Sequence, residues 1–368
     1  MSRIKLSDSE PINEDTLKGV ASGYENNLKG FEEDLEVFLS NNSFVTCTNT
    51  GTAAIHLALI ISGISKGDEV LCQSMTFIAT SNPIVYLGAT PIFIDSEEET
   101  WNMCPVLLEE AIQDRIKKGK KPKAIIVVHL YGMPAKIEEI SKIAKVYGIT
   151  LIEDAAESLG STYKGQKCGT FGDFGILSFN TNKIITANGG GALVCKDEEN
   201  KEKAKYLSNQ ARDDRHFYQH SQIGYNYKMS DILAGVGRKQ INFLESYINL
   251  RRNNNNFYKN IFKETKGVSL LSEPSNDFFS THWLTCVKIC SNITSFTREN
   301  IRQALLEDNI ESRPLWKPMH MQPVFKNAIF YGDNFSGSLF EKGLCLPSGS
   351  NLTIDDKNRI SGILRAFI

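Results

Sequence analysis

Four short segments of this chain combine residue types that could bind an anion or carry out acid–base and covalent chemistry. The first is Asn49-Thr50-Gly51-Thr52-Ala53-Ala54. Gly51 followed by Thr52 at a helix start would offer backbone N–H groups, a hydroxyl and the positive end of the helix dipole, which suit a phosphate. An ordinary helix with Thr52 as its N-cap explains the same residues. No Gly-Lys-Ser or Gly-Lys-Thr follows, so the segment is not a Walker loop.

The second and third segments carry a carboxylate and a lysine. In Ile152-Glu153-Asp154-Ala155-Ala156-Glu157, Asp154 ends an apolar run, where a carboxylate is costly unless it is paired. It could hold a protonated ring nitrogen, or it could cap the next helix. In Ser178-Phe179-Asn180-Thr181-Asn182-Lys183, Lys183 follows an apolar run closely. A lysine partly removed from water is suited to Schiff-base chemistry, although most lysines are ordinary surface residues.

The fourth segment is Gly189-Gly190-Gly191, which allows positive φ angles or a close approach of the backbone to another group. These glycines lead into an apolar, strand-like run, whereas a dinucleotide site needs Gly-x-Gly-x-x-Gly opening a helix. The first predicted strand is not followed by that pattern either. The sequence therefore disfavours a nicotinamide-dependent dehydrogenase.

From residue 44 onward, apolar β-rich runs alternate with stretches of helical spacing. Alternation of this kind predicts a mostly parallel sheet covered by helices on both faces. Ligands of such sheets bind at the carboxyl ends of the strands, where all four segments would then converge. The predicted strands are Phe44–Thr48, Glu69–Cys72, Ala89–Ile94, Ala124–His129, Thr150–Asp154, Phe174–Phe179 and Gly191–Val194, and the predicted helices are Thr52–Ile61, Ile78–Leu87 and Ile137–Tyr147. The last two strands follow each other with little between them, which predicts an antiparallel element.

The composition changes near residue 200, and a second, smaller unit is expected beyond it. Ser230–Leu250 has the pattern of one long helix capped by Ser230. Asn253–Asn256 fits either a loop or the polar face of a helix. Thr281–Ile289 alternates like a strand, and Thr297–Glu307 has the pattern of a helix capped by Thr297. We expect a large α/β domain with the N-terminal segment over residues 1–245 and a smaller C-terminal α+β domain over residues 246–368.

The overall composition is that of a soluble globular protein. The chain has 368 residues, of which 41% are hydrophobic and 23% charged, and its formal net charge is -2. The absence of a basic excess argues against nucleic acid as a partner. No stretch reaches the ~20 apolar residues of a membrane helix, and residues 1–20 are too polar for a signal peptide, so a cytoplasmic protein is expected. Eight scattered cysteines without a Cys-x-x-Cys pair indicate buried, reduced thiols and no metal site.

Taken together, the motifs resemble those of fold type I pyridoxal-phosphate enzymes, and specifically nucleotide-sugar aminotransferases of the DegT/DnrJ/StrS type. The resemblance covers roughly nine-tenths of the chain, and the combination is far more specific than any one motif. It implies a large domain built on a mostly parallel sheet and a smaller C-terminal α+β domain. The matching segments are NTGTAAIHLAL, GDEVLCQSMTFIATSNPIVYLGATPIFID, VVHLYG, LIEDAAESLGS, GTFGDFGILSFNTNK, GGGALV, GYNYKMSD, IESRPLWKPMH and KGLCLPSG.

The resemblance also implies roles around the cofactor ring. Lys183 would hold pyridoxal phosphate covalently and act as the proton carrier, with the pyridoxamine form arising during turnover. Asp154 would pair with the ring nitrogen, and Glu157 would lie near the ring hydroxyl. Many relatives have Gln at the position of Glu157, so this carboxylate must be protonated or otherwise paired. Phe77 would stack on the ring face.

Further roles concern the cofactor phosphate and the neighbouring subunit. Gly51 and Thr52 would hold the phosphate at their helix start, and Ser178 would add a hydroxyl. Asn226 in GYNYKMS would reach the phosphate of the partner subunit, which implies a homodimer with shared active sites.

The substrate implied by the resemblance is a nucleotide-linked keto sugar. The loop SFNTNKIIT is similar to that of enzymes that aminate carbon 4 of 4-keto-6-deoxy sugars, and the C-terminal segments resemble enzymes of bacillosamine-type and legionaminic-type pathways. The resulting interpretation is transamination of UDP-4-keto-6-deoxy-N-acetylglucosamine with glutamate as donor. A dTDP- or GDP-linked sugar, a sugar dehydratase of the same family and a non-catalytic regulator are alternatives, and Lys183 argues against the last two. The substrate-binding candidates are His129, Arg313 and His320.

Overall fold

A large mixed sheet forms the centre of the computed structural model, which describes residues 2–8, 26–40 and 42–368. Its strand order is β1-β9-β8-β5-β4-β2-β3-β14. Its strands are β1 (Phe44–Thr48), β2 (Glu69–Gln73), β3 (Thr90–Ile94), β4 (Ala124–Val128), β5 (Thr150–Asp154), β8 (Phe174–Ser178), β9 (Gly191–Cys195) and β14 (Ile329–Tyr331). The run from β8 to β14 is parallel, whereas β9 is antiparallel to both β8 and β1. The expected mostly parallel sheet with one antiparallel element is therefore confirmed.

Helices cover both faces of this sheet, as alternating side chains of β4 show. Ile126 belongs to the apolar cluster formed with α3 (Gly51–Ile61). Ile125 and Val127 belong to a different cluster, with residues of α5 (Pro105–Lys117) and α6 (Ile137–Tyr147). A strand whose successive side chains are all buried needs cover on both sides. The remaining helices of the large domain are α2 (Asn27–Leu39), α4 (Asn82–Tyr86), α7 (Glu198–Ser208) and α8 (Asp231–Ile241).

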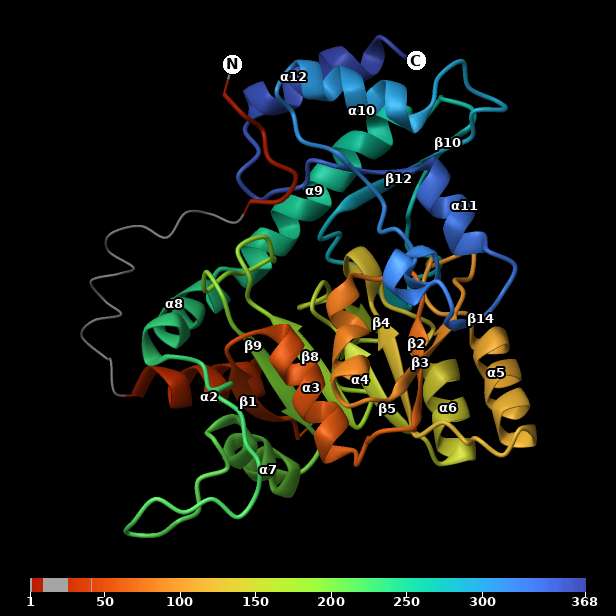
Figure 1. Cartoon of the computed structure of the whole chain (residues 1–368). Coiled ribbons are helices and arrows are strands. Elements are labelled where there is room, and N and C mark those ends of the chain that lie inside the picture. The colour runs from red at the N-terminus through yellow and green to blue at the C-terminus, as the bar shows by residue number, and fades with distance from the viewer. Residues whose placement is uncertain (1, 9–25, 41) are drawn as a thin grey trace.

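A second, four-stranded antiparallel sheet lies above the large one in Figure 1 and is reached through the long helix α9 (Leu244–Phe262). Its strand order is β10-β12-β15-β13. One face of this sheet has an apolar cluster of its own, whereas Cys286 and Cys345 on the other face join a cluster of the large domain. Its elements are β10 (Val268–Leu270), β12 (Thr285–Ile289), α10 (Arg298–Glu307), β13 (Arg313–Pro314), α11 (Phe335–Lys342), β15 (Gly343–Leu346) and α12 (Ile354–Arg365).

Three connections tie the two parts of the chain together. Strand β14 comes from the C-terminal part but pairs in parallel with β3 of the large sheet. Strand β11 (Phe278–Phe279) pairs with the hairpin of β6 (Thr162–Tyr163) and β7 (Gln166–Lys167). Near the N-terminus, Ile4 forms a parallel bridge with Ile310. The division into residues 1–245 and 246–368 stays a prediction, and these connections cross it.

Two helices predicted as continuous are broken in the structure. Ser230 caps α8 as expected, but α8 ends at Ile241 and α9 starts at Leu244. At the break, the Asn242 side chain donates to the Arg238 carbonyl, and Phe243 leaves the helical region with φ −103° and ψ 0°. The predicted helix Ile78–Leu87 is instead a 3-10 turn, η2 (Ile78–Thr80), followed by α4, which has a proline in its first turn.

The asparagine run, which the sequence left open, is helical and lies within α9. Asn254 and Asn255 are buried. Their amide groups donate to the Gly349 carbonyl (2.9 Å) and to Thr285 Oγ1 (3.4 Å), so this face of α9 packs against the small domain. Two further predictions also have clear outcomes. Thr297 caps α10 as predicted, whereas only the second half of the predicted strand Thr281–Ile289 is regular.

Candidate active site

A cavity of about 250 Å³ opens at the carboxyl ends of β4, β5 and β8. All four segments singled out from the sequence contribute to its walls. It is lined by Thr50, Gly51, Thr52, Ile55, Thr76, Phe77, Ala79, Thr80, Val128, Asp154, Ala156, Glu157, Ile176, Ser178, Asn180, Asn182, Lys183, Gly189, Gly190, Trp283 and Trp316. Residues from distant parts of the sequence meet here because parallel strands bring their carboxyl ends to one edge.

One end of the cavity is the start of helix α3. Thr50, and not Thr52, is its N-cap, because the Thr50 hydroxyl accepts from the Ala53 N–H at 3.0 Å. The N–H groups of Gly51 and Thr52 are then the first two of the helix and have no intrahelical acceptor. Ser178 also lines the cavity, and its hydroxyl lies close to Gly51. Free N–H groups, hydroxyls and the helix dipole make this end suitable for a phosphate.

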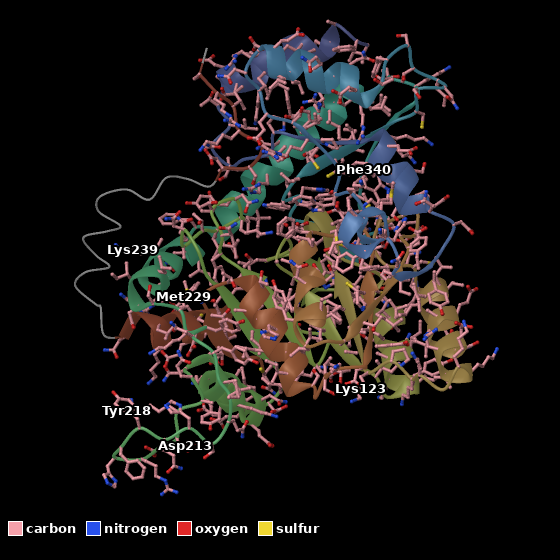
Figure 2. The ribbon with its side chains drawn as sticks, viewed as in Figure 1. Lys123, Asp213, Tyr218, Met229, Lys239 and Phe340 are labelled. Carbon is pink, nitrogen blue, oxygen red and sulfur yellow. The ribbon has the colours of Figure 1, made fainter. Side chains whose placement is uncertain are left out.

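The three glycines permit a close backbone approach at the same end. A Cβ atom on Gly191 would lie 2.4 Å from the Gly51 nitrogen, so only glycine lets β9 run against the start of α3. A Cβ atom on Gly190, whose φ is +109°, would lie 2.7 Å from Cε of Met229, a residue labelled in Figure 2. The glycines thus shape the phosphate end of the cavity and do not form a dinucleotide loop.

Asp154 and Glu153 are neighbours at the end of β5, but they face different surroundings. Asp154 lines the cavity and accepts from the Thr80 hydroxyl (2.7 Å) and the Ala156 N–H (3.2 Å). Glu153 is fully buried away from the cavity and accepts from the N–H groups of Gly169, Phe171 and Gly172. The alternation along the strand therefore separates a structural carboxylate from one that can meet a ligand.

Glu157 has two hydrogen-bond donors and a lysine beside it. Its Oε2 atom accepts from the Tyr131 N–H at 2.8 Å, and its Oε1 atom accepts from the Trp316 indole N–H at 3.3 Å. Burial raises the pKa of Glu157, while Lys183 and these donors oppose that shift. The question left by the sequence is answered in part, because this carboxylate is paired.

Lys183 lies between Glu157 and an aromatic ring. Its Nζ atom is 3.8 Å from Glu157 Oε1 and 4.4 Å from the centre of the Trp283 ring. Its side chain is 14% exposed, so it is largely removed from water while still lining the cavity. The Trp283 indole N–H donates to the Asn182 carbonyl at 2.8 Å, which fixes the ring beneath the lysine loop.

Aromatic rings form the mouth of the cavity. Phe77 is 50% exposed, and its ring centre lies 5.2 Å from that of Trp316. A half-exposed phenylalanine beside a cavity can cover the face of a planar ligand.

His129 does not line the cavity, and its role as a substrate ligand stays a prediction. Its side chain is fully buried. Its Nε2 atom is 2.8 Å from Glu153, and its Nδ1 atom accepts from the Ala135 N–H at 3.0 Å. With Nδ1 as an acceptor, the proton on Nε2 faces Glu153 and donates to it. Both nitrogens are therefore used within the core.

The remaining predicted residues lie outside the cavity walls. Arg313 is exposed in β13 and pairs with Glu311 at 2.6 Å. His320 bonds Ser74 (2.7 Å) and Asn334 (2.9 Å) through its two ring nitrogens. Their roles as substrate ligands stay predictions.

Asn226 is exposed and contributes nothing to the cavity of its own chain. Its carbonyl accepts from the Asn49 side chain at 3.0 Å. Its role at the partner's phosphate is likewise a prediction.

Sequence reasoning missed several lining residues. Thr80 bonds Asp154, and Trp283 and Trp316 enclose Lys183 and Glu157. Trp316 stands in IESRPLWKPMH, a segment recognised as similar to the family but without a role for this residue. Nothing local in the sequence marks Thr80 or Trp283, because their contacts depend on distant segments.

These residues fit pyridoxal phosphate. The α3 start can hold its phosphate, Asp154 its ring nitrogen and Lys183 its aldehyde carbon, while Phe77 can cover the ring. The shielded Oδ1 atom of Asn182 has no hydrogen-bond partner among the described residues, and a hydroxyl-rich ligand could supply one. Among all the residues that the structure describes, no group of three or more metal-ligating side chains occurs, and no helix is long and apolar enough to cross a membrane.

The fold and the site define a fold type I pyridoxal-phosphate enzyme. The family model of the DegT/DnrJ/EryC1/StrS aminotransferases matches residues 12–365, and the chain belongs to this family. EpsN of Bacillus subtilis, named a putative pyridoxal phosphate-dependent aminotransferase, is 48% identical over 341 residues, which are 92% of this chain and 87% of EpsN. A GDP-perosamine synthase of Escherichia coli O157:H7 is 38% identical, over 84% of this chain and 82% of its own.

Solved structures agree with this assignment. A DegT/DnrJ/EryC1/StrS aminotransferase from Brucella abortus superimposes with a TM-score of 0.88 at 30% identity, covering 96% of this chain and 95% of its own. The pyridoxal-phosphate form of a putative sugar aminotransferase from Streptococcus pneumoniae gives a TM-score of 0.89 at 26% identity, covering 100% of this chain and 98% of its own. The expected fold type, enzyme class and cofactor are confirmed: the chain is a pyridoxal-phosphate-dependent aminotransferase.

Proposed function

We propose that this enzyme transfers an amino group from glutamate to carbon 4 of a nucleotide-linked 4-keto-6-deoxy sugar, UDP-4-keto-6-deoxy-N-acetylglucosamine. The observation that carries the proposal is one cavity in which Lys183, Asp154 and the start of α3 face the same space. Family membership supports a sugar as amino acceptor, because relatives bear the names of sugar aminotransferases and of enzymes that make amino sugars.

The chain's own residues divide the chemical work. When bound, pyridoxal phosphate supplies the electron sink that makes a proton on the amino-bearing carbon removable. Lys183 removes that proton from glutamate and returns a proton to the sugar carbon in the second half of the reaction. Asp154 holds a positive charge on the ring nitrogen, and the α3 N–H groups keep the phosphate still. The amino group replaces the carbonyl oxygen of the sugar, which is lost as water, and a water molecule supplies the keto oxygen of the 2-oxoglutarate that leaves.

The lysine loop supports two parts of the proposal: a substrate that bears hydroxyl groups, and amination at carbon 4. Asn180 and Asn182 of SFNTNK line the cavity beside Lys183. The unpartnered Oδ1 atom of Asn182 can accept from a sugar hydroxyl or an acetamido N–H. The loop also resembles that of enzymes that aminate carbon 4.

The names of two relatives indicate alternative sugar substrates. One is named GDP-perosamine synthase, which favours a GDP-linked keto sugar as second candidate. Another, from Acidithiobacillus ferrooxidans and 33% identical, is named as a UDP-sugar 3-aminotransferase, so carbon 3 is the competing position. A sugar dehydratase of this family lacks the lysine, and Lys183 disfavours it.

The test is amination of a panel of substrates by purified enzyme with glutamate. The panel contains UDP-, dTDP- and GDP-linked 4-keto-6-deoxy sugars and UDP-linked 3-keto sugars, with products identified by mass and by NMR. We expect the UDP-linked 4-keto sugar to turn over fastest and to carry its new amine at carbon 4. An amine at carbon 3, or turnover of 3-keto sugars alone, contradicts the proposed position, and preference for a GDP sugar contradicts the proposed nucleotide.

We further propose that the enzyme acts as a homodimer whose cofactor phosphate is contacted by Asn226 of the neighbouring chain. The support is that Asn226 is exposed and lies outside its own cavity. It ends the segment from Asn209 to Asn226, which projects away from the sheet and includes Asp213 and Tyr218 (Figure 2). The segment is ordered, since Asp213 accepts from Gln219 and Ser221 within it and from Tyr206 of α7, and Asn226 lies exposed at its base beside Asn209.

A further inference from the structure

Trp316 joins the C-terminal part of the chain to the centre of the active site. Its indole N–H donates to Glu157 Oε1 at 3.3 Å, and its backbone N–H donates to the Tyr131 hydroxyl at 2.7 Å. The Tyr131 backbone N–H in turn donates to Glu157 Oε2 at 2.8 Å. These three hydrogen bonds form a closed circuit over Tyr131, Glu157 and Trp316, which we call the Trp316 hydrogen-bond circuit. Its members come from three segments that are far apart in the sequence.

The backbone of Tyr131 is fixed in an uncommon conformation that aims its N–H at Glu157. Tyr131 has φ 56°, in the left-handed region that favours glycine. The Ser161 and Ser280 hydroxyls both donate to the next carbonyl, that of Gly132, at 2.6 and 2.9 Å. A Cβ atom on Gly132 would lie 2.6 Å from Thr281 Oγ1, so this turn is closely packed. Strained backbone persists where its surroundings determine it in this way.

The Trp316 hydrogen-bond circuit donates two N–H groups to Glu157, the carboxylate beside Lys183. Glu157 Oε1 is 3.8 Å from Lys183 Nζ. Burial raises the pKa of Glu157, and the ionisable groups around it are Lys183, Asp154, Tyr131 and Cys286. Of these groups only Lys183 favours the Glu157 anion. The two N–H donors of the hydrogen-bond circuit are therefore needed to stabilise this anion.

We propose that Trp316 is a positioning residue that holds Glu157 as an anion against Lys183, so that docking of the segment after β13 completes the active site. This inference rests on the proposed role of Lys183 at the cofactor. It gives Trp316 a function beyond covering the cavity mouth with Phe77. It also explains how a carboxylate can stand where many relatives have a neutral amide, because the indole and the Tyr131 turn compensate the buried charge.

The test follows the protonation of Glu157 directly, by infrared titration of the enzyme in its pyridoxamine form without substrate, in which the Lys183 amine is not covalently bound and can face Glu157. The carboxylic acid band that Glu157→Gln abolishes identifies the group. In Trp316→Phe, which keeps an aromatic ring but removes the indole N–H, we expect this band to appear at a pH about one unit higher than in wild type. An unchanged titration in folded Trp316→Phe overturns the proposal.

Two further variants keep the result interpretable. Tyr131→Phe removes the hydroxyl that accepts from the Trp316 backbone but keeps the Tyr131 N–H, and it should shift the band in the same direction by less. It carries the test alone if Trp316→Phe does not fold, and an unchanged band in that case contradicts the proposal. Trp101 is a buried tryptophan outside the cavity walls, so Trp101→Phe should leave the Glu157 titration unchanged. An equal shift in Trp101→Phe would mean that Glu157 responds to general loosening of the protein, which also overturns the proposal.

The titration and the proposed function can fail separately. The infrared band reports Glu157 whether or not a sugar is aminated. If the amination panel fails while Trp316→Phe shifts the band, the positioning role stands and the substrate is wrong. If amination succeeds and the band does not move, the substrate stands and the role of Trp316 is refuted.

Discussion

Three carboxylates within five residues differ in their neighbours, and these neighbours decide what each can do. Glu153 is enclosed by backbone N–H groups and His129 and is structural. Asp154 keeps access to the cavity and bonds a threonine hydroxyl. Glu157 faces Lys183. Separation of titratable groups into distinct environments is how one site provides different chemical roles.

Covalent attachment of the cofactor is expected at Lys183 alone. Reduction with borohydride followed by peptide mapping should place the pyridoxyl group on this residue, because its amine is the lysine nitrogen that lines the cavity. Lys183→Ala should lose the covalent link but still bind the cofactor, since the phosphate and ring contacts remain. As a control, Lys123→Ala should be labelled like wild type, because Lys123 precedes β4 at the opposite edge of the sheet (Figure 2). Label on another lysine would refute the assignment.

Asp154→Asn should reduce kcat by at least ~10²-fold with the cofactor saturating, because a neutral amide cannot stabilise positive charge on the ring nitrogen. The matched control is Asp173→Asn, which removes a carboxylate just before β8, outside the cavity walls, and should keep kcat near wild type. Steady-state rates of the two variants decide the matter. Similar kcat values for wild type and Asp154→Asn would exclude the role.

At this scale, the sequence identifies residues whose chemistry is unusual for their position. Asp154 ends one apolar strand and Lys183 lies in the loop that follows another, and their segments match a family. Trp316 and Thr80 have ordinary positions in the sequence and gain their roles only through contacts across 159 and 74 residues. His129 matched a family segment as well, yet its ring points into the core, and side-chain direction at a strand end is decided by packing.

At the scale of elements, the start of α3 and the start of β9 form one unit. The Thr50 cap leaves the first two N–H groups of α3 without acceptors, and Gly191 lets β9 pass close to them. The alternation of strands and helices was predictable from apolar periodicity, which records burial on both sheet faces. The break between α8 and α9 was not, because Asn242 and Phe243 are compatible with a helix and only the local bond to Arg238 reveals the turn.

Gly191→Ala should weaken cofactor binding by about tenfold or more. Its Cβ atom would lie 2.4 Å from the Gly51 nitrogen and displace the start of α3, and overpacking of this kind typically costs about 1–3 kcal/mol. The measurement is the Kd of pyridoxal phosphate for the cofactor-free protein, together with Tm.

Gly362→Ala is the matched control for this change. Gly362 lies within α12 with no atom within 4 Å of its Cβ position. The substitution should leave cofactor affinity unchanged and raise stability by up to about 1 kcal/mol, because alanine favours a helix over glycine. Wild-type affinity in Gly191→Ala would show that the close approach of β9 is not needed for the phosphate site.

At the scale of the whole molecule, the chain folds back on itself so that its C-terminal part completes the large domain. Strand β14 extends the large sheet, and Trp316 enters the cavity. Neither contact was predictable, because a three-residue strand carries little periodicity and its partner is far away in the sequence. The cavity nevertheless contains no contribution from Asn226, and the proposed homodimer would supply it from outside.

Mixing two inactive variants tests whether the active site is shared between chains. Lys183→Ala and Asn226→Ala should each be severely impaired alone. In a heterodimer of the two, one site would combine Lys183 of one chain with Asn226 of the other and be wild type, while its twin would carry both changes. Subunit exchange should therefore restore up to about half of the wild-type activity per dimer if the two sites act independently.

The alternative is that Asn226 serves only its own chain, where its carbonyl accepts from Asn49. Each site in the mixture would then keep one lesion, and exchange would restore nothing. Light scattering on the same samples gives the assembly state, so that failure to form a dimer is distinguished from a dimer with independent sites. Asn226→Asp serves as a second partner for Lys183→Ala, because a carboxylate opposite a phosphate should repel it and impair the site more strongly than alanine does. Recovery of activity with both Asn226 variants would mean that the amide acts across the interface, and recovery with neither would place it within its own subunit.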